Sequence, residues 1–397
     1  MTTGTGTTGT STGAGTMRAA VVREGAFSVQ EVARPEPGPG QLLLRVVRAG
    51  ICGSDLHARQ HTDELAALGD DLGYPGIMQP AQDVVLGHEF VGEVVAYGPR
   101  TRRRWKPGTR IVALPIVRHG DDVHMVGFDE HSPGAFAEYV VVQEAFAFDV
   151  PAGVDDDVAA FTEPLAVAWH AVRRAEIAKG RPAVVIGCGP IGLAIILMLK
   201  ASGVRTIVAS DYSPTRRELA RACGATVVVD PRETSPWEAY ELPGPVASIT
   251  AYASFGITTI GRLRSVPLLP WGRLMRLGDS LGATPTGPVV FECVGVPGVL
   301  DEIFARVPLM TRVIGVGVCM QPDTVRTALA LNKEVEIRYV FGYDPEEFAH
   351  VLHLLASGRV DPRPLHTGTV GLDGLAKAFA DLGDPERHAK ILVDPRA

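Results

Sequence analysis

Two short segments of the sequence carry side chains that commonly bind transition metals. The first, CGSDLH, begins at Cys52, and the second, GHE, contains His88 and Glu89. Either segment alone is weak evidence, because a single cysteine or histidine usually serves packing or a hydrogen bond. Together they offer a thiolate, an imidazole and a carboxylate, the ligand set of an open zinc site with room for water or substrate. Glu163, in the segment TEPL, is a further candidate oxygen ligand.

A glycine turn later in the chain has the pattern of a dinucleotide-binding site. The apolar segment AVVI leads into GCGPIG and then into a helical stretch, so G-x-G-x-x-G joins a strand to a helix. The three glycines then permit a tight turn, a close approach to a pyrophosphate and close packing of the helix on the strand. The helix N-terminus presents free N–H groups to the anion. The residues expected to contact the cofactor are Gly187, Gly189, Pro190, Ile191, Gly192, Asp211 and Arg216.

The position of Asp211 bears on the choice of cofactor. It ends the next expected strand, where a carboxylate can accept a hydrogen bond from a ribose 2′-OH, and this favours NAD over NADP. Arg216 and Arg217 follow closely and complicate the choice, because arginine accommodates the 2′-phosphate of NADP. The alternative is a domain without a nucleotide, in which the glycine turn serves packing only.

The composition is that of a globular protein with two domains. The chain has 397 residues, of which 46% are hydrophobic, and this length is too great for one compact core. The 38 Lys and Arg against 45 Asp and Glu give a net charge of −7, which argues against a nucleic-acid partner. The five cysteines are far apart, so we expect no disulfide framework and a reducing, cytoplasmic location. Apart from Cys52, the cysteines are interpreted as packing residues: Cys188, Cys223, Cys293 and Cys319.

The N-terminal segment, residues 1–16, reads MTTGTGTTGTSTGAGT and is predicted to be a disordered tail. It lacks the basic and apolar regions of a secretory signal. The chain also lacks an uninterrupted run of about 18 apolar residues, so no transmembrane helix is expected.

The pattern of apolar residues changes near Glu163. Before it, short apolar runs separated by Gly and Pro predict a β-rich region. After it, strands alternate with helices, which predicts a parallel sheet covered on both faces. The early strands are expected at Leu42–Val47, Phe90–Val95, Arg110–Leu114 and Ala137–Val142. The later strands are expected at Ala183–Ile186, Thr206–Ala209, Thr226–Val229, Val289–Glu292 and Arg312–Val316, and the helices at Pro164–Ile177, Ile191–Ser202 and Pro214–Cys223.

The order of these motifs resembles the zinc-dependent medium-chain dehydrogenase/reductase superfamily, which includes alcohol, polyol and butanediol dehydrogenases. The resemblance covers nearly the whole chain from Met17 and rests on CGSDLH, GHEFVGEVV, KPGTRIV, FAEYV, EPLAVAWHA, GCGPIG, FECVG and KILVDP. It implies an α/β chain with a GroES-like, β-rich catalytic domain at about 17–168 and 341–397. A Rossmann domain, a doubly wound parallel sheet, is implied at about 169–340, with an insertion at about 236–288.

The resemblance also implies roles for the residues of the first two segments. Cys52 and His88 would be ligands of the catalytic zinc, and Glu89 a ligand or an alternate one. Glu163 occupies the position at which the polyol branch has a glutamate near the metal, bound directly or through water. Asp55 would accept a hydrogen bond from His88 and so orient it, as metal-bound imidazole generally requires.

Ser54 and His57 stand at the positions of the family's proton relay. By resemblance, Ser54 takes the proton of the alcohol and passes it through ribose hydroxyls of the cofactor towards His57. The alternative is that both residues are polar loop residues without a relay role.

The implied activity is reversible hydride transfer between NAD and a secondary alcohol, diol or polyol, with zinc stabilising the alkoxide. The partners would be a small-molecule alcohol or ketone and further copies of the chain, in a homodimer or homotetramer. The alternatives are a zinc-free NAD(P)H reductase of activated alkenes or quinones, and a non-catalytic NAD-binding protein.

The chain departs from its relatives in the segment Ala113–Pro133, which lacks the four closely spaced cysteines that hold a structural zinc in many of them. We therefore expect one catalytic zinc per subunit. The polar residues of this segment are interpreted as a solvated loop rather than a replacement metal site: His119, Asp121, Asp122, His124, Asp129 and His131.

Two further segments look longer than the family pattern requires. Residues 58–83 are expected to form an extra loop near the substrate entrance, which either shapes specificity or lies on the surface without touching substrate. In the long insertion, residues 244–278 contain four arginines and no acid: Arg262, Arg264, Arg273 and Arg276. Such a basic amphipathic stretch can touch a membrane. For the insertion we favour packing on its own domain or in an oligomer interface over membrane contact.

Overall fold

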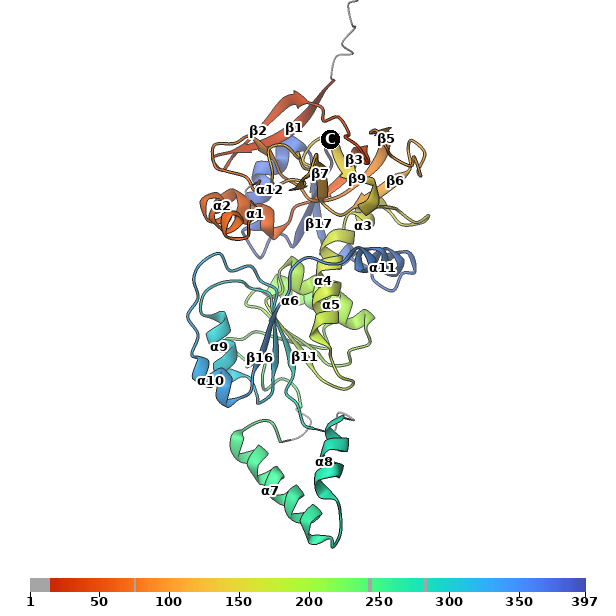
Figure 1. The fold of residues 1–397 in the computed structure, drawn as a ribbon. Coiled ribbons are helices and arrows are strands. Elements are labelled where there is room, and N and C mark those ends of the chain that lie inside the picture. The colour runs from red at the N-terminus through yellow and green to blue at the C-terminus, as the bar shows by residue number, and fades with distance from the viewer. Residues whose placement is uncertain (1–14, 75, 242–244, 281–283) are drawn as a thin grey trace, which may run out of the picture.

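The computed structural model describes residues 15–74, 76–241, 245–280 and 284–397. A β-rich part lies at one end, a parallel sheet with helices in the middle and a helical hairpin beyond it (Figure 1). The tail predicted at residues 1–16 lies mostly outside the described residues. The prediction is wrong at its last residue, because Thr16 pairs with Ala33 in the first β ladder.

The middle part contains a sheet of six parallel strands in the order β13-β12-β11-β14-β15-β16. Four of the strands, β11 to β14, consist mainly of Val, Ile and Ala because helices cover both faces of the sheet, whereas the edge strand β16 has the sequence EIRY. Chain crossings on either side of β11 leave a crevice at the carboxyl ends of the strands, where ligands of such sheets bind. The strands are β11 (Ala183–Ile186), β12 (Ile207–Ser210), β13 (Val227–Val229), β14 (Val289–Glu292), β15 (Arg312–Gly315) and β16 (Glu336–Tyr339).

The helices of this part lie on both sides of the sheet, so the predicted doubly wound α/β fold is confirmed. Helices α4, α5 and α6 lie on one side and α9 and α10 on the other (Figure 1). Helix α5 is the most deeply buried, since every residue from Gly192 to Leu199 is buried. The helices are α4 (Thr162–Ala175), α5 (Pro190–Ala201), α6 (Pro214–Cys223), α9 (Val299–Arg306) and α10 (Thr327–Asn332), and α11 (Pro345–Ala356) packs on α4.

The β-rich part is built around β3, which pairs with β5, β9 and β18 in a seven-stranded sheet. Strand β18 comes from the end of the chain, and its Leu392 lies opposite Gly50 of β3, so the last segment returns to this sheet. The strands are β1 (Thr16–Arg23), β2 (Ala26–Ala33), β3 (Gln41–Gly50), β4 (Val84–Val85), β5 (Glu89–Tyr97), β6 (Arg110–Ala113), β7 (Ile116–His119), β8 (Asp122–Met125), β9 (Tyr139–Gln143), β10 (Ala147–Asp149), β17 (His366–Val370) and β18 (Lys390–Val393). Its helices are α1 (Gly53–Gln60), α2 (Thr62–Asp71), α3 (Asp156–Ala159) and α12 (Leu375–Leu382).

The segment 58–83 is partly helical, so its prediction as an extra loop is wrong over α2. Asp63 and Glu64 lie in the first turn of α2, where acidic side chains favour the helix dipole. The helix also packs on α1, which carries the residues that follow Cys52.

The insertion at 236–288 has two structurally different portions. Its first residues belong to the middle part, because Val246 is buried and Trp237 and Tyr240 pack on a buried cluster beside the sheet. Helices α7 (Ile249–Ser265) and α8 (Trp271–Ser280) then form a hairpin that extends away (Figure 1). In the described residues, no helix combines the length and apolar character needed to cross a bilayer.

The cysteines are unpaired thiols in the described structure. Cys188, Cys223 and Cys293 are buried, in agreement with their interpretation as packing residues. Cys319 is exposed, so that interpretation is wrong for it.

Candidate metal centre and cofactor cleft

Cys52, His88 and Glu89 lie together at the edge of the main β sheet. One possible ligand atom of each, the Cys52 Sγ, a His88 ring nitrogen and a Glu89 carboxylate oxygen, lies within 4.8 Å of the others. The antiparallel ladder explains this, because Gly50 near the end of β3 lies opposite Glu89 at the start of β5. The chain then turns into α1 with Cys52 at its N-cap. Two sequence-distant segments are thus brought to one point by strand register.

Asp55 orients the imidazole of His88. Its side chain is fully buried, one oxygen accepts a hydrogen bond from the Cys52 N–H at 2.9 Å, and the other lies 3.2 Å from His88 Nδ1. The opposite ring nitrogen, Nε2, lies 3.2 Å from Ser54 Oγ. Nδ1 therefore faces a carboxylate, while Nε2 is directed to the site, the arrangement of a metal-ligating histidine.

The electrostatics of this site favour a bound cation. Burial alone would lower the pKa of His88, but the negative charges of Asp55 and Cys52 outweigh it and raise this pKa well above its usual range. The buried Glu89 Oε1 has no partner among the described residues, and Glu89 Oε2 has only the ammonium of Lys390. Unpaired buried acceptors are costly, so a positive ion among them fits the chemistry of this donor set.

Lys390 is a part of this site that the sequence did not identify. Its ammonium forms an ion pair with Glu89, and both side chains are almost completely buried. Burial lowers the pKa of Lys390, but the charge of Glu89 outweighs it and raises the value. The residue opens the apolar strand β18, where a lone lysine before ILV was the only sequence signal.

Glu163 lies beside this group at the start of α4, outside the three residues whose ligand atoms cluster. Burial and the charge of Glu89 raise the pKa of Glu163 to about 7, against the opposing effect of His88. Tyr343, which was not expected from the sequence, is a half-buried neighbour with a buried hydroxyl, and the pKa of its phenol is raised well above 10.0 by burial and by Glu163. Glu163 is therefore at the border of the site, coupled to its charges.

His57 lies on α1, which also carries Ser54. Its ring is half-buried, and burial and the neighbouring His61 lower the pKa of His57 below its usual value. The imidazole is therefore held in its neutral form at neutral pH, in which one nitrogen can accept a proton.

The glycine turn follows β11 and opens α5, as the sequence predicted. Gly187 adopts a φ of +88°, a region that favours glycine. A Cβ at Gly192 would lie 2.0 Å from the carbonyl oxygen of Gly187, so this close approach requires a glycine. A Cβ at Gly189 would meet nothing within 4 Å, so this position opens onto free space in front of the helix N-terminus.

Asp211 directly follows β12 and is held by backbone groups. One carboxylate oxygen accepts a hydrogen bond from the Cys188 N–H at 2.7 Å, and the other from the Ser213 N–H at 2.8 Å. Gly187, Gly189, Asp211 and Arg216 all line one cavity of about 740 Å³. This volume is within the range of cofactor sites. The turn, the carboxylate and the cavity therefore coincide at the carboxyl edge of the sheet.

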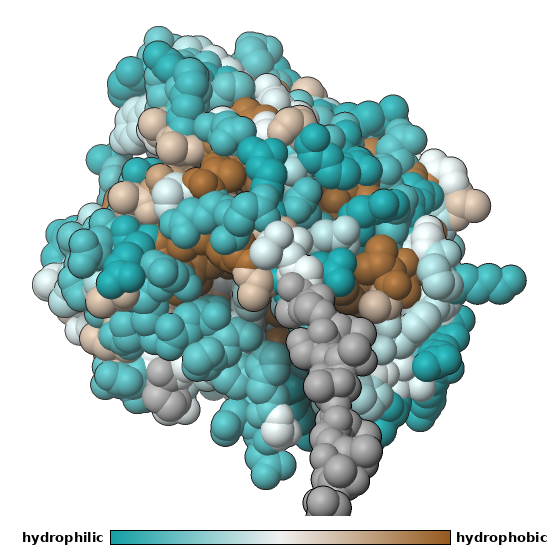
Figure 2. All heavy atoms as spheres, turned by 90° about the horizontal axis from the view of Figure 1, so that it is seen from above, coloured by the Kyte–Doolittle hydropathy of each residue, from teal (hydrophilic) through white to brown (hydrophobic). Residues whose placement is uncertain are grey.

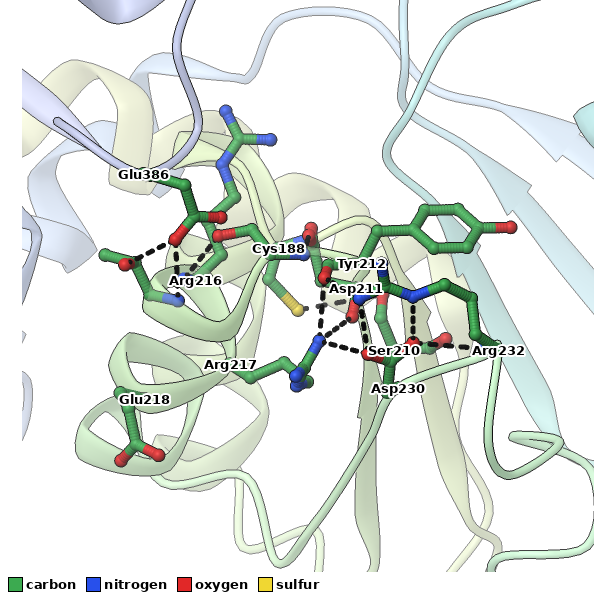
Figure 3. A network of polar contacts seen from close by, with 12 residues as sticks. Cys188, Ser210, Asp211, Tyr212, Arg216, Arg217, Glu218, Asp230, Arg232 and Glu386 are labelled. Carbon is green, nitrogen blue, oxygen red and sulfur yellow. Dashed lines mark hydrogen bonds and ion pairs between the residues drawn. The ribbon is translucent and has the colours of Figure 1, made fainter.

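The arginines beside this cavity differ in whether they pair with a carboxylate (Figure 3). Arg217 and Arg232 both pair with Asp230, at 3.0 and 2.6 Å. Arg216 lines the cavity, and its buried Nε has no hydrogen-bond partner among the described residues. Arg217 is thus occupied by Asp230, whereas Arg216 faces the space that a ligand would fill.

Comparisons with known proteins agree with this arrangement. Residues 38–152 match the family model of the alcohol dehydrogenase GroES-like domain, and residues 190–250 match that of the zinc-binding dehydrogenase. The chain is 30% identical over 376 residues to (R,R)-butanediol dehydrogenase of Bacillus subtilis, covering 92% of this chain and 96% of the relative. It is 29% identical over 372 residues to sorbitol dehydrogenase of Gallus gallus, covering 90% and 91%.

A solved structure is similar over nearly the whole length. The crystal structure of 2R,3R-butanediol dehydrogenase from Bacillus subtilis matches with a TM-score of 0.70 and 28% identity, covering 96% of this chain and 99% of that one. The predicted resemblance is thereby confirmed: the chain belongs to the zinc-dependent medium-chain dehydrogenase/reductase superfamily.

Proposed function

We propose that the protein is a zinc-dependent, NAD-dependent alcohol dehydrogenase that interconverts a secondary alcohol, diol or polyol with the corresponding carbonyl compound. The observation that carries this proposal is the convergence of Cys52, His88 and Glu89 within 4.8 Å. The relatives named for butanediol and sorbitol support an alcohol substrate with more than one hydroxyl group.

Cys52, His88 and one glutamate would hold the metal. Glu89 is paired with Lys390, and Glu163 lies at the border of the site, so both remain candidates for the inner-sphere oxygen. A zinc ion bound there would supply Lewis-acid stabilisation of the alcohol oxygen as it loses its proton. The chain's own contribution is a buried pocket of fixed ligands, with Asp55 aligning the ring of His88.

The proton leaves through the chain's hydroxyl and imidazole groups. Ser54 lies at the site, with its Oγ 3.2 Å from His88 Nε2, and would accept the proton of the substrate hydroxyl. His57, kept neutral by its lowered pKa, would be the final acceptor near the surface. NAD supplies the acceptor for the hydride, and Gly187, Gly189 and Asp211 would position it.

The proposal assigns NAD on the basis of Asp211. Its carboxylate borders the cavity at the place where the ribose 2′-OH is bound in such folds. A 2′-phosphate there would meet this negative charge, although Arg216 also lines the cavity. We assign residues 17–168 and 341–397 to the catalytic domain and 169–340 to the cofactor domain.

One zinc per subunit is proposed, because the lobe at residues 113–133 is organised by hydrogen bonds. His124 Nδ1 lies 2.6 Å from Asp129, and His119 Nε2 lies 3.0 Å from Ser132 Oγ. The ring centroids of the two histidines are 4.8 Å apart. In the described residues, the cluster with metal-ligand spacing is the group at Cys52, not this lobe.

A homodimer is proposed through the edge strand β16. This strand is the last of the six-stranded sheet, and in the described part of the chain no strand pairs with its outer edge. Tyr339 is 69% exposed and Phe341, just beyond it, 89% exposed. Two-fold pairing of these edges would cover both residues, and light scattering on the unchanged protein and on Tyr339→Lys tests it.

The function is tested by assaying a panel of alcohols, diols and polyols with NAD and NADP, together with zinc analysis. We expect NAD-linked turnover and one zinc per subunit. Cys52→Ser should lose zinc and turnover while NAD binding is largely retained. Full activity of this variant would contradict the mechanism. Zinc without turnover across the panel would point to a non-catalytic NAD-binding protein, and reduction of activated alkenes or quinones without zinc to the reductase alternative.

A further inference from the structure

The hairpin of α7 and α8 is a surface without a partner in the described structure. Neither helix contains a buried residue. The hairpin extends from the end of the molecule opposite the β-rich part (Figure 1). Because helices in globular proteins gain most of their stability by burying one face, this hairpin lacks the usual source of stabilisation. From the sequence we expected the insertion to pack on its own domain or in an oligomer interface. Packing on its own domain is wrong for the hairpin.

The turn that joins the two helices is apolar and exposed. We call Val266–Trp271, with the sequence VPLLPW, the apolar tip, since it holds no charged side chain. Val266 is 50% exposed and Trp271 43% exposed, and the side chain of Leu268 is completely exposed. Large apolar side chains gathered at the outermost point of a protein usually mark a contact surface.

Helix α8 continues the apolar surface on one side. Trp271, Leu274 and Met275 follow the i, i+3, i+4 spacing of one helix face, and each is exposed. Arg273 and Arg276 lie on the opposite side of the helical wheel. The helix therefore separates apolar from basic residues along its length.

The hairpin carries an excess of positive charge, with four arginines and one acid, Asp279 near the end of α8. Residues 245–278 contain four arginines and no acid, in a chain with a net charge of −7. All four arginines are exposed, and none of them forms an ion pair among the described residues. They flank the apolar tip on both sides along the chain: Arg262, Arg264, Arg273 and Arg276.

We propose that the hairpin docks on the surface of an anionic lipid bilayer. The apolar tip would enter the region of the head groups, with Trp271 at the interface, where the amphipathic indole is favoured. The arginines would lie against lipid phosphates, with their aliphatic stems along the apolar surface. Each basic residue near an anionic leaflet strengthens binding about fivefold at moderate ionic strength.

The positive charge of the hairpin favours an anionic lipid surface over a second copy of the chain as its partner. Two hairpins packed on one another would bring the four arginines of each copy together with only Asp279 of each copy to offset them, and such contacts oppose association. The opposite end of the molecule differs, since Figure 2 shows a mainly hydrophilic face there with apolar residues in separate patches. Docking through the hairpin would direct the β-rich part away from the bilayer.

Sedimentation of the full-length protein with vesicles tests the proposal. One set of vesicles is phosphatidylcholine alone, and the other is an equal mixture with phosphatidylglycerol. We expect binding to the mixed vesicles, weakening as salt is raised, and little binding to phosphatidylcholine. Absence of binding to both sets would overturn the proposal.

Two variants separate the parts of the surface. Leu268→Ser with Trp271→Ser removes apolar residues, and substitution of the four arginines by Gln removes charge. We expect about a fivefold loss of vesicle affinity for each arginine replaced, and loss of stable binding when the tip is changed. As a matched control, Arg205→Gln changes an exposed arginine outside the hairpin and away from the cofactor cavity, and this variant should bind as the unchanged protein does.

Light scattering gives the competing outcome. Lipid docking would be overturned by three results together: the unchanged protein does not bind vesicles, its mass rises with protein concentration, and the mass is lower in the Leu268→Ser, Trp271→Ser variant. These results would show that the hairpin serves self-association. Dehydrogenase activity of the variants verifies that they are folded, because the hairpin lies apart from the catalytic part (Figure 1).

Discussion

Gly50 makes room for the carboxylate of Glu89, which lies directly opposite it where β3 meets β5. A Cβ at Gly50 would lie 2.1 Å from Glu89 Oε2 and 3.1 Å from Lys390 Cε. The glycine is therefore required by the space of the buried site rather than by its backbone angle. In a strand this is a place where another group approaches closely.

Substitution of Gly50 by Ala should displace the Glu89 side chain and weaken the site. Overpacking of this kind costs about 1–3 kcal/mol, and we expect lower zinc content together with a lower midpoint of thermal unfolding. Gly53→Ala is the matched control, since a Cβ there meets nothing within 4 Å. Equal zinc content and equal unfolding midpoints for both variants would show that Gly50 has no such role.

Lys390 should be more important for stability than a surface lysine. Lys390→Met leaves Glu89 buried without its partner, and breaking such a pair costs about 3–5 kcal/mol. The measurement is denaturant unfolding of the protein and of the double variant Lys390→Met, Glu89→Gln. The double variant should recover much of the loss because it removes the uncompensated charge. A single variant as stable as the unchanged protein would contradict a buried ion pair.

The lowered pKa of His57 gives a pH dependence of defined sign. The unfolded chain takes up a proton at His57 near the ordinary value of about 6.5, whereas the folded chain does so only at lower pH. The unfolded state therefore binds more protons in this window, and stability falls as the pH drops through it. The free energy of unfolding should decline more steeply below pH ~6.5 than in His57→Gln.

The neighbouring residue His61 contributes to the lowered pKa of His57. Its ring centroid lies 6.1 Å from that of His57. Its charge is the second cause of the lowered pKa, after burial. In His61→Gln the resonance of His57, followed by NMR, should titrate at higher pH than in the unchanged protein. An unchanged titration would leave burial as the whole cause.

Much of the site could be predicted because its residues stand in dense local motifs. CGSDLH, GHE and GCGPIG each combine chemistry-bearing residues within a few positions, and strand register then brings the first two together. Gly50, Tyr343 and Lys390 could not be recognised in this way. Each is a single residue in an unremarkable context, and its role arises from contacts between segments that are distant in the chain.

The helices and strands were likewise predictable only in part. Expected strands such as Ala183–Ile186 and Val289–Glu292 coincide with β11 and β14, because buried parallel strands are continuous apolar runs. Helix α2 was missed since its short sequence, TDELAALGDD, contains glycine and several acids that are also common in loops. The direction of the α7–α8 hairpin could not be predicted, because amphipathic sequence alone does not say what a helix packs on.

The choice between NAD and NADP should depend on the charge of Asp211. Asp211→Asn removes the negative charge that would repel a 2′-phosphate, and its one amide oxygen can still accept one of the two hydrogen bonds that the Cys188 and Ser213 N–H groups donate to the carboxylate. We expect the ratio of kcat/KM for NAD to that for NADP to fall about 10-fold or more, since a charge-assisted hydrogen bond contributes about 1.5–3 kcal/mol.

Arg216 supplies the matched comparison, because it lines the same cavity. In the Asp211→Asn background, Arg216→Gln should lower the efficiency with NADP more than with NAD, since only NADP carries the additional phosphate for the guanidinium to bind. Thermal unfolding verifies that both variants are folded. If Asp211→Asn leaves the NAD to NADP ratio unchanged, the carboxylate does not select the cofactor, and the assignment of NAD loses its physical basis.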